Sequence, residues 1–414
     1  MSSDTSKLQP CDEYDPNSLT VEQARERIKN LVTPIAETEI VAIEHALNRV
    51  LAKPITSPMD VPPYANSAMD GYAIRAADIP AQGSRALEIV GKIFAGAPYP
   101  GQLQAGQCLR IMTGAAIPAG ADTVLMQEHV EVHASHIVIG HQHRAGDNVR
   151  HSGEDIKKNH VVFPAGHRIK PADMGLLASL GIATVTVARR LRVAFFSSGD
   201  ELKMLDETLQ PGQIYDSNRY ALLGLLQQHN VDIDDLGIVA DQPQAIRDAF
   251  SRAHAADILI TTGGVSVGDA DYIKQILAER GQVDFWKIAM KPGKPLAFGQ
   301  LGKTIFFGLP GNPVSAMVTF QQFLANSLQQ MSGETPRSAI RLTLRCLSKL
   351  KKSPGRVEFQ RGILCYDEDE LCVKTTGPQG SHVLTSMSQA NCYIILDRDN
   401  KGINAGEKVL VELM

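Results

Sequence analysis

Residues 191–330 alternate short apolar strands with helix-length segments, and this rhythm constrains the fold more than any other feature of the chain. The stretch "LRVAFFSSGDEL" is typical of a strand and its turn, and "NRYALLGLLQQH" is typical of a helix. Further on, "DILITTGGVSVGDADYIKQILAERG" indicates a strand, a glycine-rich loop and a helix. Alternating strands and helices of these lengths form a parallel, doubly wound sheet. The sequence therefore predicts an α/β domain here.

The flanking regions have different patterns. Residues 20–32 predict a capped amphipathic helix, with Thr20 as N-cap and Val21, Ala24, Ile28 and Leu31 on its apolar face. From about 86 to 145, short apolar runs alternate with Gly/Pro turns, as in a small β domain. Beyond residue 336 the pattern is again strand-like. With 414 residues, the chain is long enough for two to four domains at roughly 150 residues each.

Composition excludes some classes of protein. The formal charge of −4 argues against a general nucleic-acid surface. No apolar run approaches the roughly 20 residues needed to cross a bilayer, and the polar N-terminus has no apolar signal core. The six cysteines show no CxxC spacing. We expect a cytoplasmic protein with no membrane or nucleic-acid partner, whose cysteines are reduced and mostly packing residues.

Polar and glycine residues follow several strands of the predicted sheet. In such folds, ligands bind outside the carboxyl ends of the strands. The acids among these residues suit Mg²⁺, a hard cation that prefers carboxylate oxygens and accompanies phosphates. Each acid alone is more often a helix cap or a solvated side chain. The residues in question are Ser197, Ser198, Gly199, Asp200, Glu201, Asp241, Thr261, Thr262, Gly263, Gly264, Ser266, Gly268, Asp269, Asp271, Pro310, Gly311, Asn312 and Pro313.

The run Thr261-Thr262-Gly263-Gly264 lets backbone N–H groups approach an anion closely, because glycine carries no Cβ. It matches neither a P-loop nor a GxGxxG fingerprint, which argues against an ordinary NTPase or dehydrogenase. A plain strand-to-helix turn is the alternative reading of the same residues.

Basic groups on a stiff turn favour an oxyanion. In "KIAMKPGKP", Lys291 and Lys294 flank Pro292 and Gly293, and Arg356, Arg361 and Ser381 offer further donors downstream. Two other features are weaker. The histidine-rich stretch from His129 to His151 lacks a well-spaced cysteine or carboxylate partner, which disfavours a zinc site, and Trp286 is best explained as core packing.

The segment "DVPPYANSAMDGYAIR", residues 60–75, is too irregular for a helix and too polar for a core strand. It nevertheless presents the carboxylate of Asp70 next to a Gly turn, which predicts a ligand.

Together the motifs resemble the molybdopterin molybdenumtransferases, a family that includes the C-terminal domain of gephyrin. The resemblance runs from about residue 20 to the C-terminus, and the histidine-rich stretch lies outside it. The motifs are "NSAMDGYAIR", "RIMTGA", "GEDI", "SSGDEL", "IYDSNR", "TTGGVSVGDADY", "FWKIAMKPGKP", "GLPGNPVSAMVTF", "GRVEFQRG" and "GPQGSH".

The resemblance implies an enzyme that inserts molybdate into adenylylated molybdopterin with Mg²⁺ assistance, releasing AMP and molybdenum cofactor. The nucleophile is either a molybdate oxygen or water. It also implies an elongated homodimer of four-domain chains. The implied domains are a discontinuous N-terminal domain (19–57 and 150–190), an inserted β domain (58–149), a molybdopterin-binding α/β domain (191–332) and a C-terminal β domain (337–414).

By the resemblance, Asp70 and Thr113 reach across the dimer interface to the cofactor bound by the other chain. Further acidic positions of the family site match Asp155, Glu201, Asp241 and Asp271, and the implied metal ligands are Glu201, Asp269 and Asp271. The positions that hold the pterin, phosphate and molybdate match Ser198, Gly199, Thr262, Gly263, Gly264, Ser266, Lys287, Lys291, Lys294, Pro310, Gly311, Asn312, Pro313, Arg361 and Ser381.

Two other functions remain to be distinguished. A molybdopterin adenylyltransferase would share the 191–330 domain, but the flanking domains argue against it. A binding scaffold is disfavoured because the chain has neither a fused adenylyltransferase domain nor a long linker. As partners, the resemblance implies a separate molybdopterin adenylyltransferase and cofactor-delivery proteins of molybdoenzymes.

Overall fold

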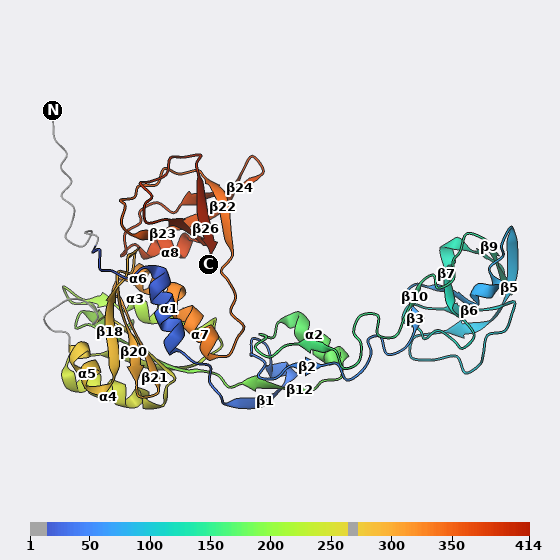
Figure 1. Cartoon of the computed structure of the whole chain (residues 1–414), viewed down its shortest axis with the longest axis horizontal. Coiled ribbons are helices and arrows are strands. Elements are labelled where there is room, and N and C mark those ends of the chain that lie inside the picture. The colour runs from blue at the N-terminus through green and yellow to red at the C-terminus, as the bar shows by residue number, and fades with distance from the viewer. Residues whose placement is uncertain (1–14, 264–271) are drawn as a thin grey trace.

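The computed structural model describes residues 15–263 and 272–414. The molecule is elongated, with an α/β body and a C-terminal β domain at one end, a small unit in the middle and an inserted β domain at the other end (Figure 1). Among the helices that the structure describes, none is both long and apolar enough to cross a bilayer.

The body is built on a six-stranded sheet. Four neighbouring strands are parallel, which confirms the predicted α/β fold. The fifth strand runs antiparallel to them, and the sixth is antiparallel to the fifth, so it runs in the direction of the first four. The reversal arises because Leu301 pairs with Thr304 across a two-residue turn, in which Gly302 has φ +61°. In spatial order the strands are β16 (Asp232–Val239), β13 (Arg192–Ser198), β17 (Ile258–Thr262), β21 (Thr304–Leu309), β20 (Pro295–Leu301) and β18 (Gln282–Lys287).

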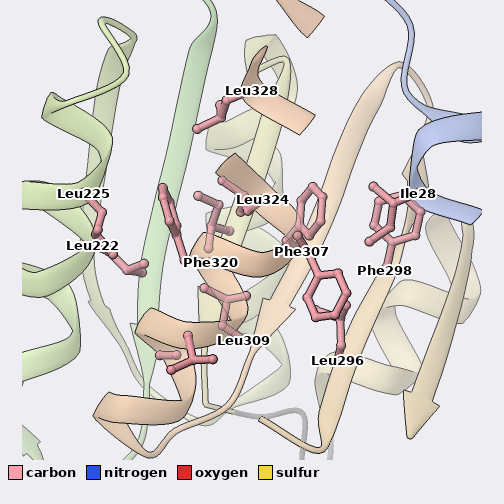
Figure 2. Packing of buried hydrophobic residues seen from close by; sticks show 14 of the residues in the cluster. Ile28, Leu222, Leu225, Leu296, Phe298, Phe307, Leu309, Phe320, Leu324 and Leu328 are labelled. Atoms are coloured by element: carbon pink, nitrogen blue, oxygen red, sulfur yellow. The ribbon is translucent and has the colours of Figure 1, made fainter. Parts of the chain in front are cut away.

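Helices cover both faces of this sheet because its central strands are apolar on both sides. In β13, Val193 and Phe195 belong to one buried cluster and Ala194 and Phe196 to the other. One face carries α1 (Val21–Leu31), α3 (Ser217–Gln227), α6 (Pro313–Thr319) and α7 (Ala325–Met331), and the other carries α4 (Pro243–Arg252) and α5 (Tyr272–Arg280). Figure 2 shows side chains of the first set packing on strand residues such as Phe307.

Helix α1 begins as predicted. The Thr20 side chain accepts a hydrogen bond from the Gln23 N–H, and the Gln23 side chain accepts one from the Thr20 N–H, which completes a capping box. Leu31 is 39% exposed, so its predicted place on the buried face is wrong; the helix ends there. The buried face of α1 packs in the core of the α/β body, whereas the resemblance implies that residues 19–57 belong to the discontinuous domain.

The middle unit joins two distant parts of the sequence. Strand β1 (Thr38–Ala42) pairs with β12 (Thr184–Ala188), and β2 (Ile55–Thr56) pairs with β11 (Val161–Phe163). Helix α2 (Pro171–Ser179) contributes Leu177 to their shared core. The unit therefore combines strands from residues 38–56 with strands from residues 161–188.

The inserted domain is a six-stranded sheet connected through a narrow neck. The neck is the strand pair β3 (Asn66–Ser67) and β10 (Val149–Arg150). In spatial order the sheet has β7 (Thr123–Met126), β4 (Gly71–Ile74), β6 (Gln107–Ile111), β5 (Ser84–Ile93), β9 (His136–Gly140) and β8 (Glu131–Val132).

The C-terminal domain is a closed barrel, because five strands pair in a ring. Helix α8 (Leu384–Gln389) lies beside it, and β19 (Met290–Lys291) of the body pairs in parallel with the first residues of one barrel strand. In ring order the strands are β23 (Val357–Asp367), β24 (Glu370–Thr375), β22 (Arg341–Cys346), β26 (Lys408–Leu413) and β25 (Cys392–Leu396).

Candidate active site

Three predicted loops start at neighbouring points of one sheet edge. Ser197 pairs with Thr262, and Thr262 pairs with Leu309, so the ends of β13, β17 and β21 lie side by side. Ser198 pairs with Val239 on the other side, which places the loop with Asp241 next to them. We call the predicted residues of these loops the sheet-end group. Its described members are Ser198, Gly199, Glu201, Asp241, Thr262, Gly263, Pro310, Gly311, Asn312 and Pro313.

The backbone packs tightly in this group. Gly263 has φ +84°, and a Cβ on it would lie 2.3 Å from the Ser198 carbonyl oxygen. Its N–H donates to the Leu309 carbonyl at 3.3 Å. Only glycine fits this position, so the Thr-Thr-Gly run has a steric cause besides any role in binding.

Hydroxyl groups line the same ends of the strands. Thr262 Oγ1 donates to Ser197 Oγ at 3.0 Å. Ser198 is 7% exposed, and its Oγ has no hydrogen-bond partner in the described part of the chain. Because buried polar atoms are nearly always paired, this hydroxyl suits a ligand atom.

Two acidic residues of the group lie close to the backbone of neighbouring loops. A Cβ on Gly199 would lie 2.7 Å from Glu201 Oε2, so this carboxylate lies over the glycine backbone. The Asp241 N–H donates to Asp200 Oδ1 at 3.4 Å, which links the loops after β13 and β16. Within residues 15–263 and 272–414, no three His, Cys, Asp or Glu side chains form a metal-binding set. Gly264, Ser266, Asp269 and Asp271 lie outside the described residues.

The start of α6 is fixed from two sides. Asn218 Nδ2 donates to the Gly311 carbonyl at 2.7 Å, and the Val314 N–H donates to the Ser381 carbonyl at 3.2 Å. The second bond comes from the C-terminal domain. It brings Ser381, predicted from a distant motif, to the residues Pro310–Pro313.

The lysine turn lies between the body and the barrel. The Ile288 N–H donates to the Lys294 carbonyl at 2.7 Å, and the Val357 N–H donates to the Ala289 carbonyl at 2.9 Å. Lys291 Nζ lies 3.9 Å from Glu358 Oε1. Lys287 instead forms a 3.1 Å ion pair with Asp15.

Arg361 is placed differently from a surface anion ligand. Its side chain is 1% exposed, and it donates to Ser386 Oγ at 3.0 Å and to the Gly380 carbonyl at 3.1 Å. Burial lowers the pKa of its guanidinium to about 10. These bonds join Arg361 to Gly380, next to Ser381, and to Ser386 of α8, so Arg361 positions the loop that carries Ser381.

Asp70 and Thr113, which come from two separate motifs, contact each other directly. Asp70 Oδ1 accepts hydrogen bonds from the Thr113 N–H at 2.7 Å and from Thr113 Oγ1 at 2.9 Å. These bonds, the backbone one first, and then the nearby Arg110 lower the pKa of Asp70 below 3.8. Arg110 is fixed over the Tyr72 ring, 5.1 Å from its centroid. Asp70 is therefore a fixed, ionised carboxylate at the surface.

Asp155 lies by the same neck. It lines an open groove of about 510 Å³ together with Val61, Pro62, Asn66, Arg150 and Glu154. Its N–H donates to the Val61 carbonyl at 3.0 Å. Asn66 is only 8% exposed, and its Oδ1 has no partner among the described residues. We call Asp70, Thr113 and Asp155 the neck group.

Within one chain, the neck group and the sheet-end group lie far from each other. In Figure 1 the neck strands β3 and β10 lie by the inserted domain, at the opposite end of the molecule from the body. The predicted site residues therefore form two separate sets.

Sequence reasoning missed Asn218, Asn66 and Arg110 as site residues. Asn218 and Asn66 lie inside the quoted motifs "IYDSNR" and "NSAMDGYAIR", so their signal was present. Arg110 begins "RIMTGA", and only the structure shows that it supports Asp70.

Three family models match the chain in order along its length. They are the MoeA N-terminal region (domain I and II) at residues 19–181, a probable molybdopterin binding domain at 194–330, and the MoeA C-terminal region (domain IV) at 343–414.

The chain is also similar to whole proteins. The molybdopterin molybdenumtransferase of Haemophilus influenzae is 42% identical over 95% of this chain and 98% of its own length, and that of Nostoc is 38% identical over 91% and 88%. The crystal structure of a molybdopterin biosynthesis moeA protein from Pyrococcus horikoshii OT3 matches with a TM-score of 0.84 at 27% identity, covering 96% of this chain and all of that one. The chain therefore belongs to the molybdopterin molybdenumtransferase family.

Proposed function

We propose that this transferase inserts molybdate into adenylylated molybdopterin, releasing AMP and forming molybdenum cofactor. The observation that carries the proposal is the sheet-end group. It combines close backbone approach at Gly263, an unpaired buried hydroxyl at Ser198 and carboxylates at a single edge. Such a surface suits an anionic, phosphate-bearing pterin.

The lysine turn and the loop that carries Ser381 would bind the oxyanion. Lys291 and Lys294 are charged donors suited to a tetrahedral dianion, and Ser381 lies at the nearby start of α6. Arg361 acts through the loop that carries Ser381, because its described hydrogen bonds go to that loop.

Carboxylate oxygens are the ligand type that Mg²⁺ prefers, so Glu201 fits the implied metal, together with Asp269 and Asp271 of the predicted set. When bound, Mg²⁺ supplies charge neutralisation at the phosphate oxygens.

The neck group would complete the cleft from a second copy in a homodimer. Support for this comes from its separation from the sheet-end group within one chain (Figure 1). Asp70 is ionised and fixed by Thr113, so it can orient a reacting group without rearranging.

A separate adenylyltransferase would supply the substrate, and cofactor-delivery proteins would accept the product. A cytoplasmic location is part of the same proposal.

The test is AMP release from adenylylated molybdopterin by the purified protein. We expect release only when molybdate is added, with molybdenum cofactor as the second product. Transfer of AMP from MgATP to molybdopterin would instead identify an adenylyltransferase. Release that does not depend on molybdate would contradict molybdenum insertion.

A further inference from the structure

Two cysteines lie directly opposite each other on neighbouring strands of the C-terminal barrel. Strands β23 and β24 form an antiparallel hairpin in which Cys365 pairs with Cys372, and both thiols are free. Two other barrel cysteines, Cys346 and Cys392, belong to the buried apolar cluster inside the barrel, so core packing accounts for them. Cys365 and Cys372 belong to none of the apolar clusters that the described residues form. Their presence needs another explanation.

The two facing side chains project from the outside of the barrel. The next pair of the hairpin, Leu364 and Val373, packs in the barrel core. Because successive side chains of a strand alternate between the two faces of a sheet, Cys365 and Cys372 point to the outer face. Directly opposite residues share a face, so the two thiols are neighbours there.

The hydrogen bonds of the core pair show how far apart the cysteines are. The Leu364 N–H donates to Asn391 Oδ1 at 2.9 Å, and the Val373 carbonyl accepts from the Leu347 N–H at 2.8 Å. The backbone groups of Leu364 and Val373 therefore point away from each other. Because the two kinds of pair alternate in an antiparallel ladder, the facing cysteines form a hydrogen-bonded pair. Their Cα atoms are then about 5.5 Å apart, a separation that a disulfide spans.

The two thiols differ in their access to solvent. Cys365 is partly exposed, whereas Cys372 is buried. On its other side, Cys372 pairs with Arg345 of β22. The Arg345 guanidinium is held over this face by Glu370 Oε2 at 2.7 Å and Asp367 Oδ2 at 2.9 Å. A reagent from solution therefore reaches Cys365 first.

A metal site explains the pair less well. Structural zinc sites use four ligands, and catalytic ones use three and a water, drawn from thiolates, imidazoles and carboxylates. In the part of the chain that the structure describes, no three such side chains form a metal-binding set. Two facing thiols with no third ligand are instead suited to forming a bond with each other.

We propose that Cys365 and Cys372 form a reversible thiol–disulfide site that reacts with small-molecule disulfides such as oxidised glutathione. The Cys365 thiol loses its proton to solvent, and its thiolate attacks one sulfur of the reagent. The S–S bond of the reagent breaks, and one glutathione thiolate leaves and takes up a proton. The Cys372 thiolate, formed in the same way, then attacks the Cys365 sulfur of the mixed disulfide and expels the second glutathione. Two protein thiols are thus oxidised, and one glutathione disulfide is reduced to two glutathione molecules.

A single tryptic peptide reports this reaction. Trypsin cleaves after Arg361 and Lys374, so residues 362–374 form one peptide, which contains Cys365, Cys372 and no other cysteine. The folded full-length protein is incubated with oxidised glutathione, its remaining thiols are blocked with iodoacetamide in urea, and the digest is analysed by mass spectrometry. We expect this peptide to lose two hydrogen atoms and both alkylation sites. Dithiothreitol added before the block should restore both.

Three variants separate the roles of the thiols. Cys372→Ser removes the second step, so a glutathione adduct should persist on Cys365. Cys365→Ser removes the accessible thiol, so Cys372 should stay largely unmodified. Cys346→Ser is the matched control, because it replaces a thiol on the inner face of the same barrel and should leave disulfide formation unchanged.

Several other results would contradict a facing dithiol. One is a glutathione adduct that stays on Cys365 of the wild type without closing to a disulfide, and another is a peptide that keeps both thiols free. Linkage of either residue to Cys346 or Cys392 would identify a different pair. A disulfide that forms only in the urea-unfolded chain would show that the fold does not bring the two thiols together.

Discussion

At the scale of single residues, the Asp70–Thr113 pair gives the sharpest prediction. The Thr113 backbone N–H makes the largest contribution to lowering the pKa of Asp70, and the Thr113 hydroxyl makes the next. Thr113→Val removes only the hydroxyl, so the pKa of Asp70 should rise but stay below 3.8. NMR titration of the Asp70 carboxyl measures this directly.

A matched control is Thr376→Val, which removes a threonine hydroxyl from the barrel, far from Asp70. The carboxylate form of Asp70 should persist to lower pH in the wild type than in Thr113→Val. An unchanged Asp70 pKa in Thr113→Val would show that the hydroxyl does not hold the carboxylate in solution.

Residue types predicted some of the site and not the rest. Gly263 and the two lysines of the turn could be picked out from the sequence, because a glycine after a strand and lysines beside prolines are unusual at those positions. The burial of Arg361 could not be predicted from the sequence, because an arginine that binds an anion and an arginine that holds a loop have the same sequence pattern. That distinction depends on the contacts of Arg361 with Gly380 and Ser386 in the folded barrel.

At the scale of elements, the lysine turn depends on glycine at 293. Gly293 has φ +99°, and a Cβ on it would lie 2.6 Å from Thr319 Oγ1 on α6. Gly293→Ala should destabilise the fold by more than the about 1–2 kcal/mol typical of a left-handed non-glycine residue. By displacing Lys291 and Lys294, it should also raise the molybdate concentration needed for half-maximal AMP release.

Gly302→Ala provides the comparison, because Gly302 has φ +61° and open space around its Cβ position. Gly302→Ala should lower the free energy of unfolding only through the left-handed backbone conformation, and it should leave the molybdate requirement unchanged. Thr319→Ala, combined with Gly293→Ala, should recover part of the loss. Equal losses of stability in the two glycine variants would contradict the steric argument.

The elements also show which parts of the fold the hydrophobic periodicity of the sequence can predict. Strand–loop–helix units from 191 to 330 were predictable because each buries its apolar residues with a clear local period. The antiparallel direction of β20 was not, since it depends on a two-residue turn at Gly302. The packing of α1 on the body was also missed, because its apolar face does not specify which core will bury it.

At the scale of the whole molecule, the junction between the middle unit and the body should respond to pH. Arg168 Nε donates to the buried Glu334 Oε2 at 2.8 Å across this junction, and Arg168 Nη1 donates to the Asn48 carbonyl at 3.1 Å. His229 lies beside this pair. Burial, and then the charge of Arg168, lowers the pKa of His229 from 6.5 to about 4.

Because the unfolded chain binds a proton on this histidine at a higher pH than the folded chain does, stability is full above about pH 6.5 and falls as the pH approaches 4. His229→Asn should flatten the change in unfolding temperature between pH 7 and pH 5. His45→Asn, at an exposed histidine, should leave it unchanged. A wild-type unfolding temperature that does not fall over this range would show that His229 does not couple folding to pH.

The shared cleft makes a prediction about mixed dimers. An Asp70→Ala chain lacks its neck carboxylate, and a Lys294→Ala chain lacks a lysine of the turn, so each homodimer should have two damaged clefts. In a heterodimer of the two, one cleft combines the intact neck of one chain with the intact turn of the other. Purified heterodimers should therefore release AMP at about half the wild-type rate, because one of two clefts is complete.

The decisive control pairs a wild-type chain with a chain carrying both Asp70→Ala and Lys294→Ala. If each cleft takes its neck group and its lysine turn from different chains, both clefts of this heterodimer are damaged and its rate should stay near that of the single variants. If each chain builds its own site, the wild-type chain is complete, and this heterodimer, rather than the first one, should retain about half the activity. The two heterodimers carry the same two substitutions, so the ratio of their rates reports only on whether the neck group serves its own chain or the other one.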